Sequence, residues 1–260
     1  MTEPRKAGKL GLIPKELPAK LGMMSSYMIN PLGAPPPTLT WPASLSSCGM
    51  LGNGPDPSAP DYPNGVGDCT IAGVFHLRML AAALCGQVEA WPSGAVTIAI
   101  YMSLSGGRDS GLVEADVLRA WRDRGLWGNK IAGYAPLDIA NDDEIRAACA
   151  LFGGTKVDVK VPANAMAQFD AGEPWHLDGS GADDEYEGGH SIVRCGYYVD
   201  KTWGPVWGTL TWARVQLATD EWMAKNVMQD WAVLTNEFVT ADPHRVDVTA
   251  LQADIAKLAA

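Results

Sequence analysis

Hydrophobic residues in the first half of the chain recur at helical spacing. After Asp68, a good N-cap residue, apolar positions follow every three or four residues, and Gly86 provides a stop. This pattern predicts a helix that begins at Cys69 and ends before Gly86. Ser93 and the acidic run after Asn141 mark the starts of other helices. These further helices are predicted over residues 94–104, 112–124 and 145–152.

The second half of the chain changes to the alternating pattern of strands. Residues 156–161 alternate between polar and apolar side chains, as a half-buried strand does. Further strands are predicted over residues 191–199, 208–215 and 230–234, and a last helix over residues 248–258. Helices followed by strands predict an α+β fold, in which a helical half packs on an antiparallel sheet half.

Prolines set the N-terminal part of the chain apart. Residues 1–44 contain prolines at spacings that forbid long helices and central strands, so we predict an extended, proline-rich N-terminal arm. Apolar residues within this arm indicate that it packs on the domain surface or on a protein assembly partner. Residues 45–240 are predicted to form one domain, and residues 241–260 a C-terminal helical appendage.

The charge balance narrows the possible partners. The 260 residues carry 20 basic and 30 acidic side chains, a formal net charge of −10, without a large basic cluster. Nucleic acid and anionic membrane are therefore not expected partners. The sequence shows no signal-peptide h-region and no apolar run long enough to cross a bilayer. We expect a cytoplasmic protein.

The cysteines indicate free thiols. Their number is odd, their spacing is irregular and they form no CxxC pair, which is typical of a reducing compartment. The four histidines form no zinc-ligand pattern with them, so neither a metal nor another cofactor is expected. The five cysteines are Cys48, Cys69, Cys85, Cys149 and Cys195.

Two of these features suggest chemistry. Cys69 lies in the first turn of a predicted helix, where unpaired N–H groups favour a thiolate, so it is a candidate nucleophile. His190 opens a predicted strand and is a candidate general base. The alternatives are a small core cysteine and a solvated histidine at a loop edge.

The order of several short motifs resembles the papain-like cysteine peptidase fold. Gly67, Asp68 and Cys69 come first, and Gly189 and His190 come far downstream. The run from Lys201 to Gly208 then contains two Trp-Gly pairs at the spacing of the family motif Asn-Ser-Trp-Gly-x-x-Trp-Gly. Residues 169–175 add a likeness to a little-characterised papain-like group of actinobacteria and their phages. The resemblance covers roughly residues 45–235.

The resemblance implies a thiol hydrolase, a peptidase or amidase, that acts on a peptide substrate through Cys69 and His190. It also implies that Trp203 and Trp207 cover the histidine and shield it from water. Trp175 and Gly189 are the other candidate substrate-binding residues. Core packing is the alternative role for each tryptophan, and it is favoured for Trp175.

The chain departs from the family pattern at two positions. Lys201 stands where the family has the asparagine that orients the histidine, and Asp200 is the nearest acceptor. Pro63 stands near the place of the oxyanion glutamine, and Asn64 is the nearest side-chain donor. These departures leave an alternative open. A catalytically reduced papain-like module would serve as a phage structural protein, associated with the virion or capsid and assembled through the N-terminal arm.

Overall fold

A single antiparallel sheet organises the chain in its computed structural model, which describes residues 7–18, 21–29, 33–86, 91–236 and 246–256. The strand order is β1-β6-β2-β3-β4-β5, and every neighbouring pair is antiparallel. The strands are β1 (Ile131–Pro136), β2 (Thr155–Pro162), β3 (Tyr186–Asp200), β4 (Gly204–Thr211), β5 (Arg214–Thr219) and β6 (Val227–Thr235).

The helices agree with the α+β fold predicted from the sequence. Ser93 caps α2 by accepting from the Val96 N–H, and Asn141 caps α4 by accepting from the Glu144 N–H. The described α-helices are α1 (Cys69–Leu84), α2 (Gly94–Leu104), α3 (Glu114–Asp123), α4 (Asp142–Phe152), α5 (Ala163–Ala171), α6 (Asp220–Asn226) and α8 (Val248–Ala256). Short 3-10 helices cover Met24–Tyr27, Ala43–Ser47 and Gly181–Asp184.

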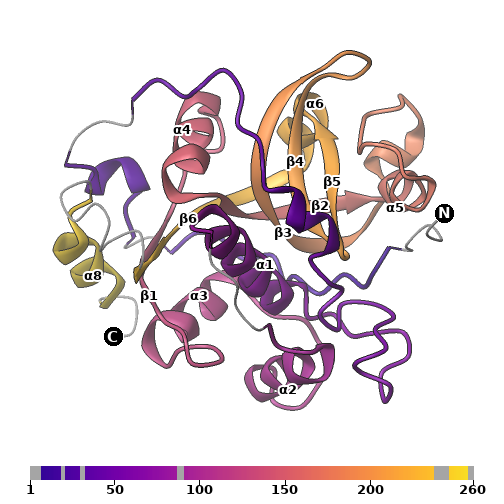
Figure 1. Cartoon of the computed structure of the whole chain (residues 1–260), viewed down its shortest axis with the longest axis horizontal. Coiled ribbons are helices and arrows are strands. Elements are labelled where there is room, and N and C mark those ends of the chain that lie inside the picture. The colour runs from indigo at the N-terminus through magenta and orange to yellow at the C-terminus, as the bar shows by residue number, and fades with distance from the viewer. Residues whose placement is uncertain (1–6, 19–20, 30–32, 87–90, 237–245, 257–260) are drawn as a thin grey trace.

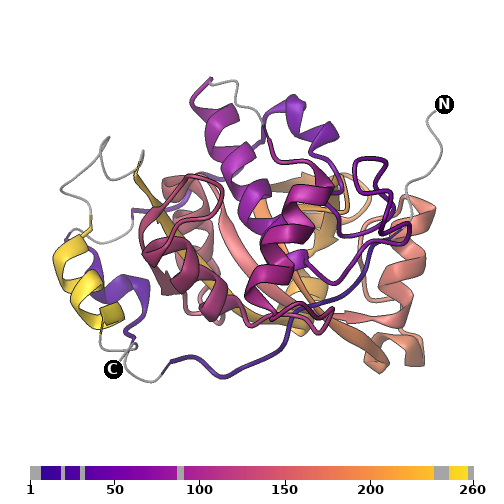
Figure 2. The same cartoon turned by 90° about the horizontal axis from the view of Figure 1, so that it is seen from below.

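Helix α1 lies at the centre of the molecule and packs against β3 (Figure 1). Because most of its side chains are buried, it joins the helical half to the sheet half. At one end of the molecule, α8 packs against β1 and the 3-10 helix Met24–Tyr27 (Figure 2). Leu251 of α8 is buried there, in the same core as Met24 and Tyr27. The division of the chain at residues 44 and 240 stays a prediction.

The predicted strand over residues 208–215 was wrong, because the chain reverses direction within it. β4 ends at Thr211 and β5 begins at Arg214. Trp212 and Ala213 between them have φ of 42° and 65°, the left-handed conformation at both central residues of a tight hairpin turn. Such turns usually carry asparagine or glycine, so no residue pattern indicated this one. Strand β1 and helices α5 and α6 were also not predicted.

No helix among the described residues has both the length and the apolar character needed to cross a membrane.

Candidate active site

Cys69 is the first residue of α1, as predicted, and it is buried with 1% of its surface exposed. Burial raises the pKa of its thiol from 9.0 to about 12. The main-chain N–H groups of Ser191 and Gly11, together with the Lys156 ammonium, act in the opposite direction and lower the pKa. The sulfur therefore lies beside the residue that follows His190 on β3. In this closed environment it is held as a neutral thiol.

His190 lies on β3 and is also buried, with 1% of its surface exposed. Its Nε2 is 2.6 Å from the Thr211 hydroxyl oxygen, and its ring stacks on Trp212 with centroids 4.4 Å apart. Nδ1 has no hydrogen-bond partner among the described residues. Burial, with smaller contributions from His76 and Lys156, lowers the pKa of His190 from 6.5 to about 3. The imidazole is therefore neutral at pH 7.

The β4–β5 hairpin supplies both groups that hold the histidine. Thr211 is the last residue of β4, and the left-handed turn that follows places the Trp212 ring against His190. The Trp212 Nε1–H donates to Asn53 Oδ1 over 2.8 Å. Asn53 comes from the loop before α1, so this bond ties the hairpin to that loop.

Asn53 is a buried side-chain donor in this site. Its Nδ2 donates to the main-chain oxygens of Lys9 and Val66 over 2.9 and 3.1 Å. It also lies near Asp68, the residue before Cys69, because its amide lowers the pKa of that carboxyl. Burial is the larger effect and raises the pKa of Asp68 well above 3.8, which favours the protonated acid.

A buried charge cluster lies behind the Cys69 and His190 elements. Lys156 Nζ donates to Glu114 Oε2 and to Ser191 Oγ, both over 2.7 Å, and Ser191 Oγ donates to the same Glu114 oxygen. All three side chains are buried. Helix α1 passes directly over the ammonium, because a Cβ at Gly73 would be 3.0 Å from Nζ. The absence of a side chain at Gly73 lets the helix lie this close.

Residues 7–13, here called the cleft segment, cover the site. The segment runs between two main-chain lips, Gly111 with Leu112 on one side and Gly188 with Gly189 on the other. The Leu12 N–H donates to the Gly189 oxygen over 3.1 Å. The Leu112 N–H donates to the Gly11 oxygen, and the Ile13 N–H donates to the Leu112 oxygen, both over 2.9 Å. A strand of polypeptide therefore fills the passage above Cys69.

Further contacts fix the start of the cleft segment. The Ala7 N–H donates to Asp170 Oδ1, and the Lys9 N–H donates to the main-chain oxygen of Asn53, both over 2.7 Å. Lys9 Nζ lies 3.5 Å from Asp109 Oδ2. The other oxygen of Asp109 accepts from the Gly67 N–H and the Tyr101 hydroxyl. Asp109 therefore links the cleft segment to the loop that leads into α1.

The other predicted site residues lie in different places. Asn64 is exposed on a turn. Asp200 accepts the N–H groups of Thr202 and Trp203 and so stabilises the β3–β4 turn, whereas the histidine's partner is Thr211. The Gly189 oxygen accepts from the cleft segment.

None of the predicted tryptophans is the ring against His190. The Trp203 ring packs on His176, with ring centroids 4.6 Å apart, and the Trp207 ring packs on Tyr197, with centroids 5.1 Å apart. Trp175 is in the core, where it stacks on Trp222 and meets Trp212 edge-on. The ring that stacks on the histidine is Trp212 because the chain turns after β4, which the motif spacing did not reveal.

Sequence reasoning missed three residues of this site: Asn53, Thr211 and Trp212. The only local signal for the last two was a hydroxyl residue directly before a tryptophan. The same combination occurs at Thr202 and Trp203, which belong to the Trp-Gly motif on which the family resemblance rests. Asn53 lies 16 positions before Cys69 (69 − 53), in a glycine- and proline-rich loop without a distinguishing pattern.

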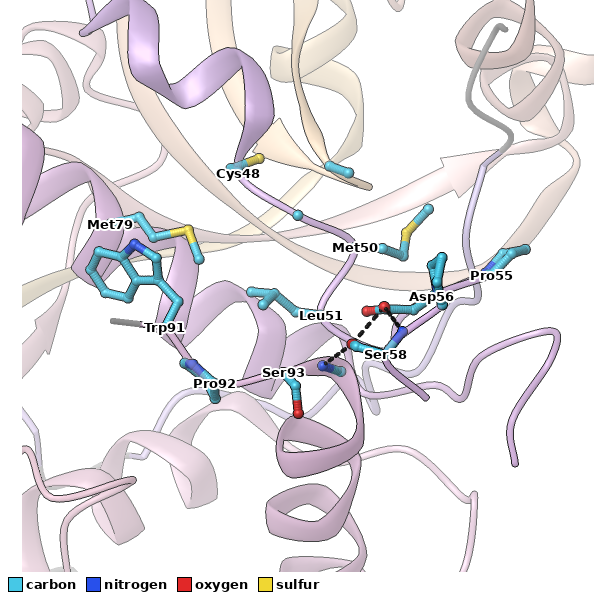
Figure 3. A pocket seen from close by; sticks show the side chains of 14 residues that line it. Cys48, Met50, Leu51, Pro55, Asp56, Ser58, Met79, Trp91, Pro92 and Ser93 are labelled. Carbon is cyan, nitrogen blue, oxygen red and sulfur yellow. Dashed lines mark hydrogen bonds between the residues drawn. The ribbon is translucent and has the colours of Figure 1, made fainter. Parts of the chain in front are cut away.

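A cavity of about 720 Å³ lies next to this region, between the loop before α1 and the start of α2 (Figure 3). Met79 and Trp91 line one side of it, and Met50 lines the other. Asp56 and Ser58 lie at its polar end, where Ser58 Oγ donates to Asp56 and accepts the Gly94 N–H. Its wall includes Ala213, the residue after Trp212.

Within the part of the chain that the structure describes, histidine, cysteine and acidic side chains form no group of three or more that is placed to hold a metal ion.

Comparisons with known proteins show the fold of this chain. No family model and no curated protein matches the sequence. Xylellain, a cysteine protease from Xylella fastidiosa, matches with a TM-score of 0.62 at 14% identity, over 90% of this chain and 99% of that one. The Amb a 11 cysteine protease of ragweed pollen, in its proform, matches with a TM-score of 0.54 at 9% identity, over 83% and 71% of the two chains.

A cathepsin B precursor from Trypanosoma congolense is also similar, with a TM-score of 0.52 at 11% identity over 90% of this chain and 87% of that one. At sequence identities this low, the similarity shows a shared fold. The helical half with Cys69 at the start of α1, packed on the antiparallel sheet with His190 on β3, is a papain-like fold.

Proposed function

We propose that this chain is a papain-fold thiol hydrolase that cleaves peptide or amide bonds, with Cys69 as nucleophile and His190 as general base. The observation that supports it most is the setting of His190. One ring nitrogen is bound to Thr211, a tryptophan covers the ring, and Nδ1 has no partner among the described residues. The sulfur of Cys69 lies beside the N–H of the next residue, Ser191.

The proposal gives each ring nitrogen of His190 a role. In the proposed mechanism Nε2–H donates to Thr211 Oγ1, and in this tautomer Nδ1 is the acceptor of the Cys69 proton. The thiolate attacks the carbonyl carbon of the substrate. His190 then returns the proton to the leaving amine as the carbon–nitrogen bond breaks and a thioester remains. Water, deprotonated by His190, hydrolyses the thioester and regenerates the thiol.

Asn53 is our candidate for the side-chain donor that stabilises the oxyanion. Its Nδ2 already binds a main-chain oxygen of the cleft segment, and its Oδ1 is fixed by Trp212. Unpaired N–H groups of the first turn of α1 supply the second donor. One such donor is typically worth about 2.7–4 kcal/mol of transition-state stabilisation. Asn53 thereby takes the role for which the sequence offered only Asn64.

The cleft segment holds the site in a closed state. It occupies the passage that a substrate peptide would need, and burial favours neutral Cys69 and His190 over the ion pair. Hydrolysis on this proposal requires that residues 7–13 leave the passage. Water and substrate then reach the sulfur, and the burial that opposes the thiolate is relieved.

A second candidate is a catalytically reduced module of the same fold. Burial of a neutral pair, and a threonine where the family has an asparagine, favour this reading. The resemblance to a papain-like group of actinobacteria and their phages gives it a concrete form, a virion-associated structural protein. This candidate predicts that Cys69 stays unreactive even when the cleft segment is displaced.

A displacement experiment separates the two candidates. A Cβ on residue 11 would lie 1.7 Å from the Gly67 oxygen, so Gly11→Ala should expel the cleft segment. We expect the full-chain G11A protein to hydrolyse a quenched fluorescent peptide library. Iodoacetamide should alkylate its Cys69 faster than the exposed Cys85. Adding Cys69→Ala should abolish hydrolysis. Gly33→Ala, where nothing lies within 4 Å, is the matched control.

If Cys69 of the G11A protein is labelled no faster than Cys85 and no peptide is hydrolysed, the result would instead support the catalytically reduced module.

A further inference from the structure

We propose that the passage above Cys69 is selective for glycine. The polypeptide that it accepts has a glycine as the residue that faces the floor beside the nucleophile. As a statement about the substrate, this rests on the hydrolase function proposed above. The selectivity of the passage itself is a binding property that can be measured without any turnover.

The floor of the passage is main chain. Gly67, two residues before Cys69, lies directly under Gly11, and a Cβ on Gly11 would be 1.7 Å from the Gly67 oxygen and 2.5 Å from its Cα. Real Cβ atoms do not approach backbone this closely. The obstacle cannot move aside as a side chain would, because the Gly67 N–H is tied to Asp109 over 2.8 Å.

The walls are also main chain and bind the occupant from both sides. A Cβ on Gly111 would lie 2.5 Å from the Gly11 oxygen, and one on Gly189 would lie 2.7 Å from the Leu12 oxygen. These glycines let both lips approach close enough to hydrogen-bond the segment between them. The passage is therefore one strand wide, and a bulkier residue in the occupant cannot be relieved by a sideways shift.

The restriction applies at the nucleophile. The Gly11 N–H lowers the pKa of the Cys69 thiol, so residue 11 of the cleft segment is the one beside the sulfur. Side chains of a strand bound at both edges alternate between the floor and the open side. Whichever way a peptide runs, the residue that faces the floor above Gly67 meets the same backbone. Only glycine fits there without displacing it.

Leu10 and Leu12 show what the passage accepts on either side of that glycine. Leu12 is buried, and the Leu10 side chain lies against Gly188, where a Cβ would be 3.2 Å from its Cδ1. Apolar residues flanking a glycine therefore describe the class of peptide that fits. The cleft segment, with leucine on both sides of Gly11, carries this pattern itself.

Peptide binding in trans tests the selectivity. The full-chain variant Gly11→Val has a segment that cannot seat, so its passage is open to a synthetic peptide with the sequence of residues 5–15. We expect this peptide to bind. A peptide with alanine in place of the glycine that matches Gly11 should bind about ten- to a hundredfold more weakly, the range that overpacking costs imply. Alanine at the position of Leu10 should matter less.

Two further proteins keep the test interpretable. Gly8→Val provides a second unseated variant if Gly11→Val does not fold, because a Cβ on Gly8 would lie 2.1 Å from the Asn53 oxygen. Gly33→Val leaves the segment seated and should not bind either peptide. Near-infrared fluorescence polarisation or calorimetry gives the affinities, and circular dichroism checks the folding of each variant.

Equal affinity for the glycine and alanine peptides would overturn the inference, and so would the failure of both to bind to a folded, unseated variant. Glycine-selective binding without hydrolysis would uphold the selectivity and count against the hydrolase function. Hydrolysis without any preference for glycine would do the reverse.

Discussion

The hydroxyl oxygen of Thr211 lies 2.6 Å from Nε2 of His190, where a papain-like enzyme is expected to use an asparagine. Both residues are buried, and Trp212 covers the histidine ring. A threonine hydroxyl can accept the ring N–H, as an asparagine oxygen would, and the bond holds the ring in its orientation. The β4–β5 turn places this oxygen, so the orientation of His190 depends on the hairpin.

Thr211→Val should therefore destabilise the protein and reduce any hydrolysis. Valine is close to threonine in shape but leaves Nε2 without its buried partner, which costs about 1–3 kcal/mol. At about 2–4 °C per kcal/mol, thermal unfolding should show a lower Tm. Thr202→Val, at an exposed position on the β3–β4 turn, is the control and should leave the Tm nearly unchanged. Equal Tm values for the two variants would contradict the role of Thr211.

The free energy of unfolding should decrease as the pH is lowered, and His190 should account for part of this decrease. The unfolded chain binds a proton at this residue near pH 6.5, but the folded chain does so only near its lowered pKa of about 3. Between these values the unfolded state binds more protons, so acid destabilises the fold. From pH 6.5 to about 5 this histidine alone should cost about 2 kcal/mol of unfolding free energy.

Urea unfolding at several pH values checks this expectation. His190→Asn should flatten the profile relative to the unsubstituted protein, since other titrating groups are common to both. His76, whose buried ring has a pKa lowered to about 4, should contribute with the same sign between pH 6.5 and about 4. Parallel profiles for the unsubstituted protein and His190→Asn would mean that the histidine is hydrated in the folded state.

Lys156→Met should be among the more damaging single substitutions. It leaves the Glu114 carboxylate buried without its cation, and breaking a buried pair in this way typically costs about 3–5 kcal/mol. Arg119→Ala is the matched control, because its 2.7 Å pair with Asp116 is on the surface and is worth about 0–1 kcal/mol. Chemical denaturation measures both, and similar losses would show that Lys156 is not effectively buried.

In the closed protein, Cys69 should be alkylated more slowly than the exposed Cys85. With its pKa raised to about 12 it is almost entirely a thiol at pH 7, and the cleft segment blocks access to the sulfur. Mass spectrometry after brief iodoacetamide treatment should find Cys85, the exposed cysteine, modified first. Raising the pH should speed the modification of Cys69. Labelling of Cys69 before Cys85 at pH 6 would show that the closed state holds a thiolate.

Much of the fold could be predicted because the signals for it are local. Apolar spacing after Asp68 and the caps at Ser93 and Asn141 predicted the helical half. Alternation over residues 156–161 predicted the strand that pairs with β3. The candidate nucleophile and base were accessible for the same reason, since a cysteine at a helix start and a histidine on a strand are local features.

The surroundings of that pair depend on contacts between residues far apart in sequence. Asn53 joins the hairpin through Trp212, and Lys9 binds to Asn53 and to Asp109. Each contact forms only after the loop before α1, the β4–β5 turn and the cleft segment have come together. Motif spacing instead pointed to Trp203 and Trp207, because a turn made by two left-handed, non-glycine residues leaves no local pattern.

By itself, then, the sequence determined most of the helices, the strands β2, β3 and β6, and the residues that carry a thiol and an imidazole, because periodicity and capping act over a few neighbouring positions. Only the tertiary structure decided that Thr211 holds the histidine and that residues 7–13 fill the passage above the sulfur. Those choices depend on close main-chain approaches between distant segments, which glycines at positions 11, 67 and 189 permit but do not specify.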